Sequence, residues 1–294
     1  MLYFIHALNA LLMIVMPILL GVFLARRLGL KWSLYAVGAV TFVASQVVHI
    51  PLNIGLTALF ANEILPAPPA AWRLPFNAVV LGLTAGLCEE IARYLVYRSW
   101  IKSARTWREA LMFGAGHGGI EAVITGALVG VAFVQLAALR YVDVSTLPIP
   151  ADQQALAAKQ IAEYWLAPWY ASLLGAVERA FALCFHLSAA VLVLQAVARR
   201  NLLWLVAAIL WHTAINAVSI FVSGTWGIYW GEVAVGAFAV GSLAILFALK
   251  PGGTETLPEL VSAAPIPETT PARIPVTDPE ADLRRKVDET RFTS

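Results

Sequence analysis

Long apolar runs separated by short polar links dominate this chain. Seven of the runs are long enough to cross a bilayer, because a spanning helix needs about 20 predominantly apolar residues. They cover residues 2–25, 33–60, 74–97, 109–139, 168–198, 201–222 and 227–249. The pattern predicts an all-α, polytopic membrane protein with about seven transmembrane helices.

The composition supports this class. Of 294 residues, 60% are hydrophobic and 13% are charged, whereas soluble domains average about 25% charged. Cys88 and Cys184 both lie in apolar runs and lack the spacing of a disulfide framework or a thiolate metal site. The first run has no basic residues before it, so we expect it to be retained as a membrane span.

Basic residues occupy every second link between the runs. These links carry Arg26, Arg27 and Lys31, then Arg98, Lys102, Arg105 and Arg108, then Arg199 and Arg200, and finally Lys250. The other links, 61–73, 140–167 and 223–226, carry only Arg73, Arg140 and Lys159. By the positive-inside rule, the protein lies in the cell membrane with its N-terminus outside and its C-terminus in the cytoplasm.

The chain divides at Pro251. Residues 1–250 form the predicted transmembrane domain, in which 140–167 is an outer connector that could include an interfacial helix. Residues 251–294 are rich in Pro, Thr and Glu, then mixed in charge, which predicts a disordered cytoplasmic tail. The chain shows no internal repeat, which disfavours the inverted-repeat transporter folds.

Ionisable side chains inside the apolar runs are the candidate functional residues, because a charge at bilayer depth costs several kcal/mol. The third run has Glu89 and Glu90, with Arg93 one helical turn away from both. The later runs add His117 and Glu121, then Glu178, Arg179 and His186, then His212 and Asn216. The glycines around His117 allow either close backbone approach or an unwound stretch.

Helix geometry places several of these residues at similar depth. At ~1.5 Å per residue, Glu90, His117, His186 and His212 lie ~12 to ~20 Å from the basic ends of their runs. We therefore expect them to meet around one wet cavity that opens toward the cytoplasmic half of the membrane. The four glutamates of the set face two arginines, so two protons or one divalent cation would be needed for neutrality.

Two kinds of chemistry fit such a set. Three imidazoles, or imidazoles with a carboxylate, could bind a zinc-like ion while a free glutamate serves as general base. Alternatively, a glutamate could activate water directly, with the histidines and Asn216 stabilising the oxyanion. No H-E-x-x-H segment is present, which excludes the common zinc-protease helix.

Structural roles compete with these. Glu89 and Arg93 could form an ion pair that locks the third helix, and Glu178 with Arg179 could do the same in the fifth. Glu121, four residues after His117, could orient that imidazole. Ser45, His49 and Asn53 form a polar stripe on the second run, for which we favour a packing role.

Four segments resemble the YhfC family of intramembrane metalloproteases. They are C-E-E-I-A-R-Y at 88–94, G-A-G-H-G-G-I-E-A at 114–122, E-R-A-F-A-L-C-F-H at 178–186 and W-H-T-A-I-N-A-V at 211–218. The family is similar in motif order to the PrsW-type proteases and to the CAAX-prenyl-protease and bacteriocin-processing membrane proteases. The resemblance covers the third to sixth runs.

The resemblance implies hydrolysis of a peptide bond in a membrane-associated protein or peptide, with no nucleic-acid partner. It implies that Glu89 and Glu90 supply the base, that Arg93 holds them, and that Asn216 assists the oxyanion. It also implies that His117, His186 and His212 bind a metal ion, which could be Zn²⁺, or stabilise the oxyanion; we add Glu121 to the candidate catalytic set. The alternative from the residues alone is a proton- or ion-coupled transporter that uses the same Glu and His residues as a relay.

Overall fold

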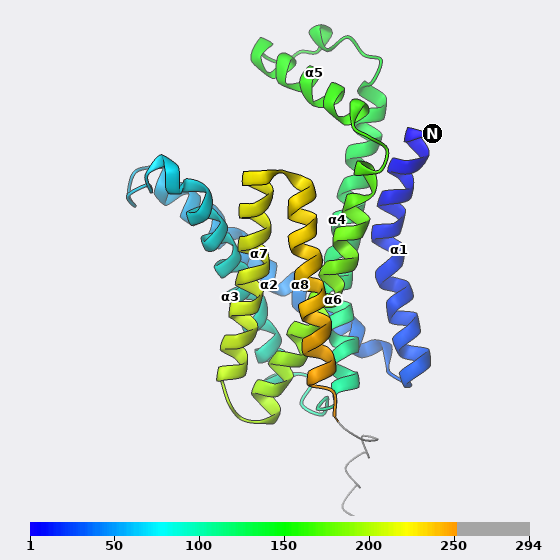
Figure 1. The fold of residues 1–294 in the computed structure, drawn as a ribbon, viewed down its shortest axis with the longest axis vertical. Coiled ribbons are helices and arrows are strands. Elements are labelled where there is room, and N and C mark those ends of the chain that lie inside the picture. The colour runs from blue at the N-terminus through cyan, green and yellow to red at the C-terminus, as the bar shows by residue number, and fades with distance from the viewer. Residues whose placement is uncertain (252–294) are drawn as a thin grey trace, which may run out of the picture. The chain divides into compact units, whose positions relative to one another are not determined.

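The computed structural model describes residues 1–251, and this part of the chain is all-α (Figure 1). Its helices are α1 Leu2–Leu28, α2 Trp32–Ala61, α3 Arg73–Ser99, α4 Trp107–Leu139, α5 Ala151–Leu166, α6 Leu174–Ala198, α7 Leu203–Trp226 and α8 Ile228–Ala248. The predicted all-α class is confirmed. Apart from Pro251, the predicted tail lies outside the described residues, so its disorder stays a prediction.

Six described helical segments are long and apolar enough to cross a membrane. They are α1, α2, α4, Ala171–Ala198, α7 and α8. The seventh long helix, α3, has 27 residues, which gives it a length of ~40 Å. It differs from the other six because Glu89, Glu90 and Arg93 interrupt its apolar sequence. The chain is therefore a multi-pass membrane protein, and about seven spans is the number the sequence predicts.

Successive long helices run in opposite directions, so the links alternate between two ends of the bundle. The lower end in Figure 1 carries the links that contain Arg and Lys, and we call it the basic end. These links are 29–31, 100–106 and 199–202. The N-terminus and the connector that contains α5 lie at the opposite end. The alternation agrees with the charge pattern used above, although it does not orient the bundle in a membrane.

The connector between α4 and α6 contains the expected additional helix, α5. Tyr164 of α5 stacks on His6 of α1 with ring centroids 4.2 Å apart, and Trp165 Nε1 donates to the Leu136 carbonyl of α4 at 3.2 Å. These contacts attach α5 to the end of the bundle that carries the N-terminus.

Helix α4 lies in the centre of the packing, against α1, α2 and α6. Its glycines favour close approach over unwinding, because α4 is helical throughout its 33 residues. A Cβ atom on Gly116 would lie 1.9 Å from the Tyr35 carbonyl oxygen of α2, and one on Gly38 of α2 would lie 2.1 Å from the Phe113 carbonyl oxygen. Only glycine fits at this crossing, which brings α2 against the part of α4 that carries His117.

Candidate metal centre and active site

Four helices contribute the polar residues of the site. Helix α3 provides Glu89, Glu90 and Arg93, α4 provides His117 and Glu121, α6 provides His186, and α7 provides His212 and Asn216. Glu90, Arg93 and His117 are 0% exposed. These residues lie close together in two groups that share Arg93.

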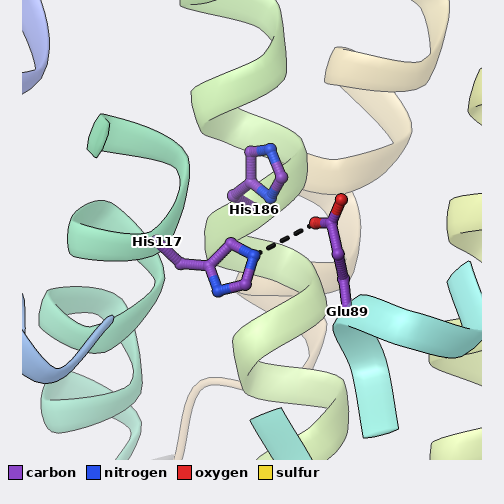
Figure 2. Close-up of side chains that lie close together, drawn as sticks. All are labelled: Glu89, His117 and His186. Atoms are coloured by element: carbon purple, nitrogen blue, oxygen red, sulfur yellow. Dashed lines mark hydrogen bonds and ion pairs between the residues drawn. The ribbon is translucent and has the colours of Figure 1, made fainter. Parts of the chain in front are cut away.

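The first group consists of Glu89, His117 and His186, which come from three helices and converge in Figure 2. One possible ligand atom from each lies within 4.8 Å of the other two. His117 Nε2 and Glu89 Oε2 are 3.0 Å apart. Close packing makes this possible, because a Cβ on Gly118 of α4 would lie 2.5 Å from the His186 ring.

This group fits a metal ion by its donor chemistry. Two imidazole nitrogens and one carboxylate oxygen are a ligand set that catalytic zinc sites use. All three residues are buried, and the His117 nitrogen that faces the group is Nε2. The sequence predicted His117, His186 and His212 as ligands, so the structural group differs by having Glu89 where His212 was expected.

Glu121 contacts His186 and does not orient His117, the partner considered from the sequence. Its Oε2 lies 2.7 Å from His186 Nε2, and its Oε1 accepts from Arg179 Nη1 at 2.6 Å. Arg179 also donates to Glu178 Oε1 at 2.5 Å. If Nε2 donates its proton to Glu121, the Nδ1 atom of His186 retains its lone pair, which is the arrangement of a metal-binding histidine held by a carboxylate.

The second group consists of Glu90, Arg93 and His212. Glu90 Oε1 accepts from Arg93 Nη1 and lies 2.7 Å from His212 Nδ1. Glu90 Oε2 is buried and lacks a hydrogen-bond partner among the described residues. His212 is therefore held by Glu90, and its ring centroid is 6.3 Å from that of His186.

Arg93 links the two groups. Its Nη2 atom lies 2.7 Å from His186 Nδ1 and 3.7 Å from Glu89 Oε2. A positive group thus contacts two of the three candidate ligands. Binding of a divalent cation through His186 Nδ1 would require Arg93 Nη2 to move away, because the Nδ1 lone pair cannot accept this hydrogen bond and coordinate a metal at the same time. The Arg93 charge would then be balanced mainly by Glu90, which is the carboxylate it contacts most closely.

A cavity of about 90 Å³ adjoins the two groups, and such a volume holds a few water molecules. Its polar lining comprises Glu89, Glu121, Glu178, Arg179, His186, His212, Asn216 and Ser219. Glu90 and His117 do not line it. Of the two adjacent glutamates, Glu89 is therefore the one that faces the cavity.

The cavity extends away from the basic end, and the expectation that it opens toward the cytoplasmic half stays a prediction because the bundle is not oriented in a membrane. Its lining reaches Glu178, which lies in the first turns of α6 at the opposite end and is 41% exposed. On the basic side, Tyr97, Phe113 and Leu194 belong to a buried hydrophobic core that closes the bundle. Depth along each helix could not reveal which side was closed.

A chain of hydrogen bonds on α2, which was interpreted as packing, reaches the site. Gln46 Nε2 donates to Glu89 Oε1 at 3.4 Å, and Gln46 Oε1 lies 3.1 Å from His49 Nδ1. Asn53 Nδ2 is 2.9 Å from His49 Nε2, and Thr84 of α3 donates to Asn53 Oδ1 at 3.0 Å. Gln46 was missed, although its spacing of three residues from His49 places it on the same helical face.

Comparison with known proteins gives a family match over most of the transmembrane region. The model of the family described as YhfC intramembrane metalloprotease matches residues 12–235. The uncharacterized membrane protein YhfC of Bacillus subtilis (strain 168) is 32% identical over 219 residues, which cover 73% of this chain and 82% of that protein. No solved structure matches the chain.

Proposed function

This chain belongs to the YhfC family of intramembrane metalloproteases, and from that membership we propose that it hydrolyses a peptide bond of a membrane-associated protein or peptide. The observation that best supports the proposal is the convergence of Glu89, His117 and His186 from three helices into one buried group beside a small polar cavity. Buried carboxylates and imidazoles of this kind are costly to place within a membrane protein, so a functional use is expected.

In this proposal, Glu89, His117 and His186 would hold a divalent metal ion, with zinc the best match to two nitrogens and one oxygen. When bound, the ion would supply Lewis acidity toward water and toward the scissile carbonyl. Glu121 orients His186 through the 2.7 Å contact between its carboxylate and Nε2.

Proton transfer is assigned to Glu89, because this glutamate faces the cavity where water can enter. Its Oε2, which lies beside His117 Nε2, would be the ligand atom. Its Oε1, which accepts from Gln46 at 3.4 Å, would be left off the metal and is the atom proposed to accept the proton of the attacking water. Glu90 keeps Arg93 and His212 in place through Oε1. On α7, His212 and Asn216 line the same cavity, where they are proposed to stabilise the oxyanion.

Cleavage assays with purified protein and candidate membrane peptides test this proposal. Glu89→Gln, Glu90→Gln and His186→Ala should each lower the cleavage rate by at least about 100-fold, the scale of losing a general base or a preorganised electrostatic group. Glu178→Gln is a suitable control, because this half-exposed residue contacts Arg179 at the far end of the cavity. Full activity of all three site variants would refute the assignment.

A proton- or ion-coupled transporter is the second candidate, and the hydrogen-bonded chain on α2 favours it. That chain runs from Glu89 through Gln46 and His49 to Asn53, which lines a separate cavity of about 430 Å³ between α2 and α3. However, the Gln46 amide cannot pass a proton onward without an unfavourable tautomer. Uptake that follows a proton gradient, without any cleavage product, would favour transport over proteolysis.

The membrane orientation is also proposed, with the N-terminus outside and the C-terminus in the cytoplasm. It is supported by the placement of the arginine- and lysine-rich links at one end of the bundle. In this orientation the cavity extends from the level of Glu89 and His186 toward the outer face, so a substrate would reach the site from the outer side.

A further inference from the structure

The basic end of the bundle contains a cavity of about 650 Å³ that is separate from the candidate metal centre. Its walls come from the end of α3, the link to α4, the end of α6 and the link to α7. Its lining residues are Tyr94, Arg98, Lys102, Arg105, Ala196, Val197, Arg200 and Leu202. Four of these eight side chains are cationic, and none is acidic.

The four cations of this basic cavity lack carboxylate partners. Among the described residues, none of them takes part in an ion pair. Arg93 and Arg179, which lie within the bundle, are both paired with glutamates. The Arg105 guanidinium donates to backbone carbonyls, among them that of Tyr97 at 3.1 Å, and these neutral acceptors do not compensate its charge. A concave surface with several uncompensated positive charges attracts anions.

Arg200 adopts a backbone conformation that is unfavourable for its residue type. Its φ angle is +52°, in the left-handed region where glycine has no steric cost. The backbone amide of Asn201 donates to the Ala196 carbonyl at 3.1 Å, and this hydrogen bond closes the turn that ends α6. In turns of this kind the left-handed residue, here Arg200, is usually glycine. Arg200 occupies this strained position and also lines the basic cavity. The combination indicates a functional role for its side chain in the cavity.

We propose that the basic cavity binds the phosphate group of an anionic membrane lipid. Arginine side chains match phosphate oxygens with paired N–H groups, and lysine adds a compact positive charge. A lipid is favoured over free phosphate because Tyr94, Val197 and Leu202 give the cavity an apolar wall. The cavity also lies where α3 and α6 end and α7 begins, at the basic end of the bundle, and in the membrane orientation proposed above this end meets the lipid headgroups.

Lipid binding to the full-length purified protein tests this site without any assay of proteolysis. Native mass spectrometry would compare retention of phosphatidylglycerol with that of zwitterionic phosphatidylcholine, and we expect preferential retention of phosphatidylglycerol. Arg200→Gly should weaken phosphatidylglycerol binding by about fivefold, the typical contribution of one basic side chain near an anionic membrane surface. The same variant should unfold at the same temperature or higher, because glycine relieves the left-handed strain.

Arg199→Gln is the matched control, because it removes one charge from the neighbouring residue. The Arg199 side chain lies over the Trp204 ring at 4.9 Å and does not line the basic cavity. Phosphatidylglycerol binding should therefore change less than twofold in this variant. Lys102→Gln, a second lining variant on a different link, should lower the affinity as Arg200→Gly does.

Three results would overturn the proposal. Equal retention of both lipids would show that the charges confer no selectivity. An effect of Arg199→Gln equal to that of Arg200→Gly would assign the binding to general surface charge. Displacement of the lipid by inorganic phosphate at equal concentration would identify a site for the free anion, without a contribution from the apolar wall.

Discussion

Glu121 shows how the role of a carboxylate depends on a neighbouring helix. Its spacing from His117 predicts a contact along α4, but the carboxylate reaches across to His186 and Arg179 on α6. The i, i+4 rule gives only the shared face of one helix. Which residue of another helix meets that face depends on helix rotation, which a single sequence does not determine.

Replacing Glu121 by Gln should therefore lower metal affinity. Loss of a carboxylate that orients a metal-binding histidine typically weakens binding by about 10- to 100-fold. The measurement is a competition titration of the purified protein against a chelator of known affinity. Glu178→Gln, which also removes a carboxylate from Arg179 but not the one that contacts His186, should retain affinity within about twofold. Equal losses in the two variants would contradict the role given to Glu121.

His117→Ala and His212→Ala should separate the structural ligand group from the one predicted by sequence. His117 lies in the group with Glu89 and His186, so its loss should reduce bound metal to below about a tenth of the wild-type amount. His212 is held by Glu90, so its replacement should leave the metal content near the wild-type value. Elemental analysis of the two purified variants decides between the groups. Loss of metal from both variants would restore the three-histidine prediction, and loss from His212→Ala alone would contradict both ligand groups.

At the scale of elements, the close crossing of α2 and α4 depends on glycine. Gly116→Ala would place a Cβ 1.9 Å from the Tyr35 carbonyl oxygen, and a backbone atom cannot move aside as a flexible side chain can. Overpacking of this kind costs about 1–3 kcal/mol or more. The temperature of unfolding in detergent should fall accordingly.

Gly130→Ala in the same helix is the control for that prediction. Its Cβ would meet only Ala10 Cβ at 3.7 Å, which is ordinary van der Waals contact. Alanine also favours a helix interior over glycine by up to about 1 kcal/mol. The Gly130 variant should therefore unfold at the wild-type temperature or above. Similar destabilisation by both substitutions would contradict the role given to the crossing, because alanine at Gly130 meets no close backbone contact.

The elements were largely predictable because each apolar run is long and bounded by polar links. The sequence predicted helix α3 from the length of its apolar run, although Glu89, Glu90 and Arg93 distinguish it from the other spans. What the sequence left open was whether the glycines around His117 unwind the helix or allow contact. The answer depends on an opposing surface, here the Tyr35 carbonyl of α2, that no local pattern contains. The polar stripe of α2 was likewise visible from the spacing within one helix. Its contact with Glu89 through Gln46 was not predicted, because that contact joins two helices.

At the scale of the whole molecule, the distribution of basic residues and the direction of the cavity are opposed. The basic links lie at one end, where Tyr97, Phe113 and Leu194 close the core. The cavity beside Glu89 and His186 extends toward Glu178 at the other end. Depth counted along the helices predicts how far the site lies from each end, whereas the closure of one side follows from packing between helices.

Labelling of single cysteines tests both the membrane orientation and the direction of the cavity. The native Cys88 and Cys184 would first be replaced by serine to give a background without thiols. A membrane-impermeant thiol reagent applied outside intact cells should then modify Tyr141→Cys, which replaces an 82% exposed residue of the outer connector, and should spare Lys102→Cys. Ser219→Cys, in the cavity lining, should react from the same side at a slower rate because its thiol is reached only through the cavity.

Ala190→Cys supplies the comparison for the closed side, since this residue is fully buried in the core near the basic end. It should resist the reagent in intact cells and also in inside-out vesicles, where Lys102→Cys becomes reactive. Modification of Lys102→Cys from outside would reverse the proposed orientation. A different result would be modification of Ser219→Cys only in inside-out vesicles while Tyr141→Cys is still labelled from outside. The orientation would then be correct, but the site would be reached through the basic end and the proposed access route would be wrong.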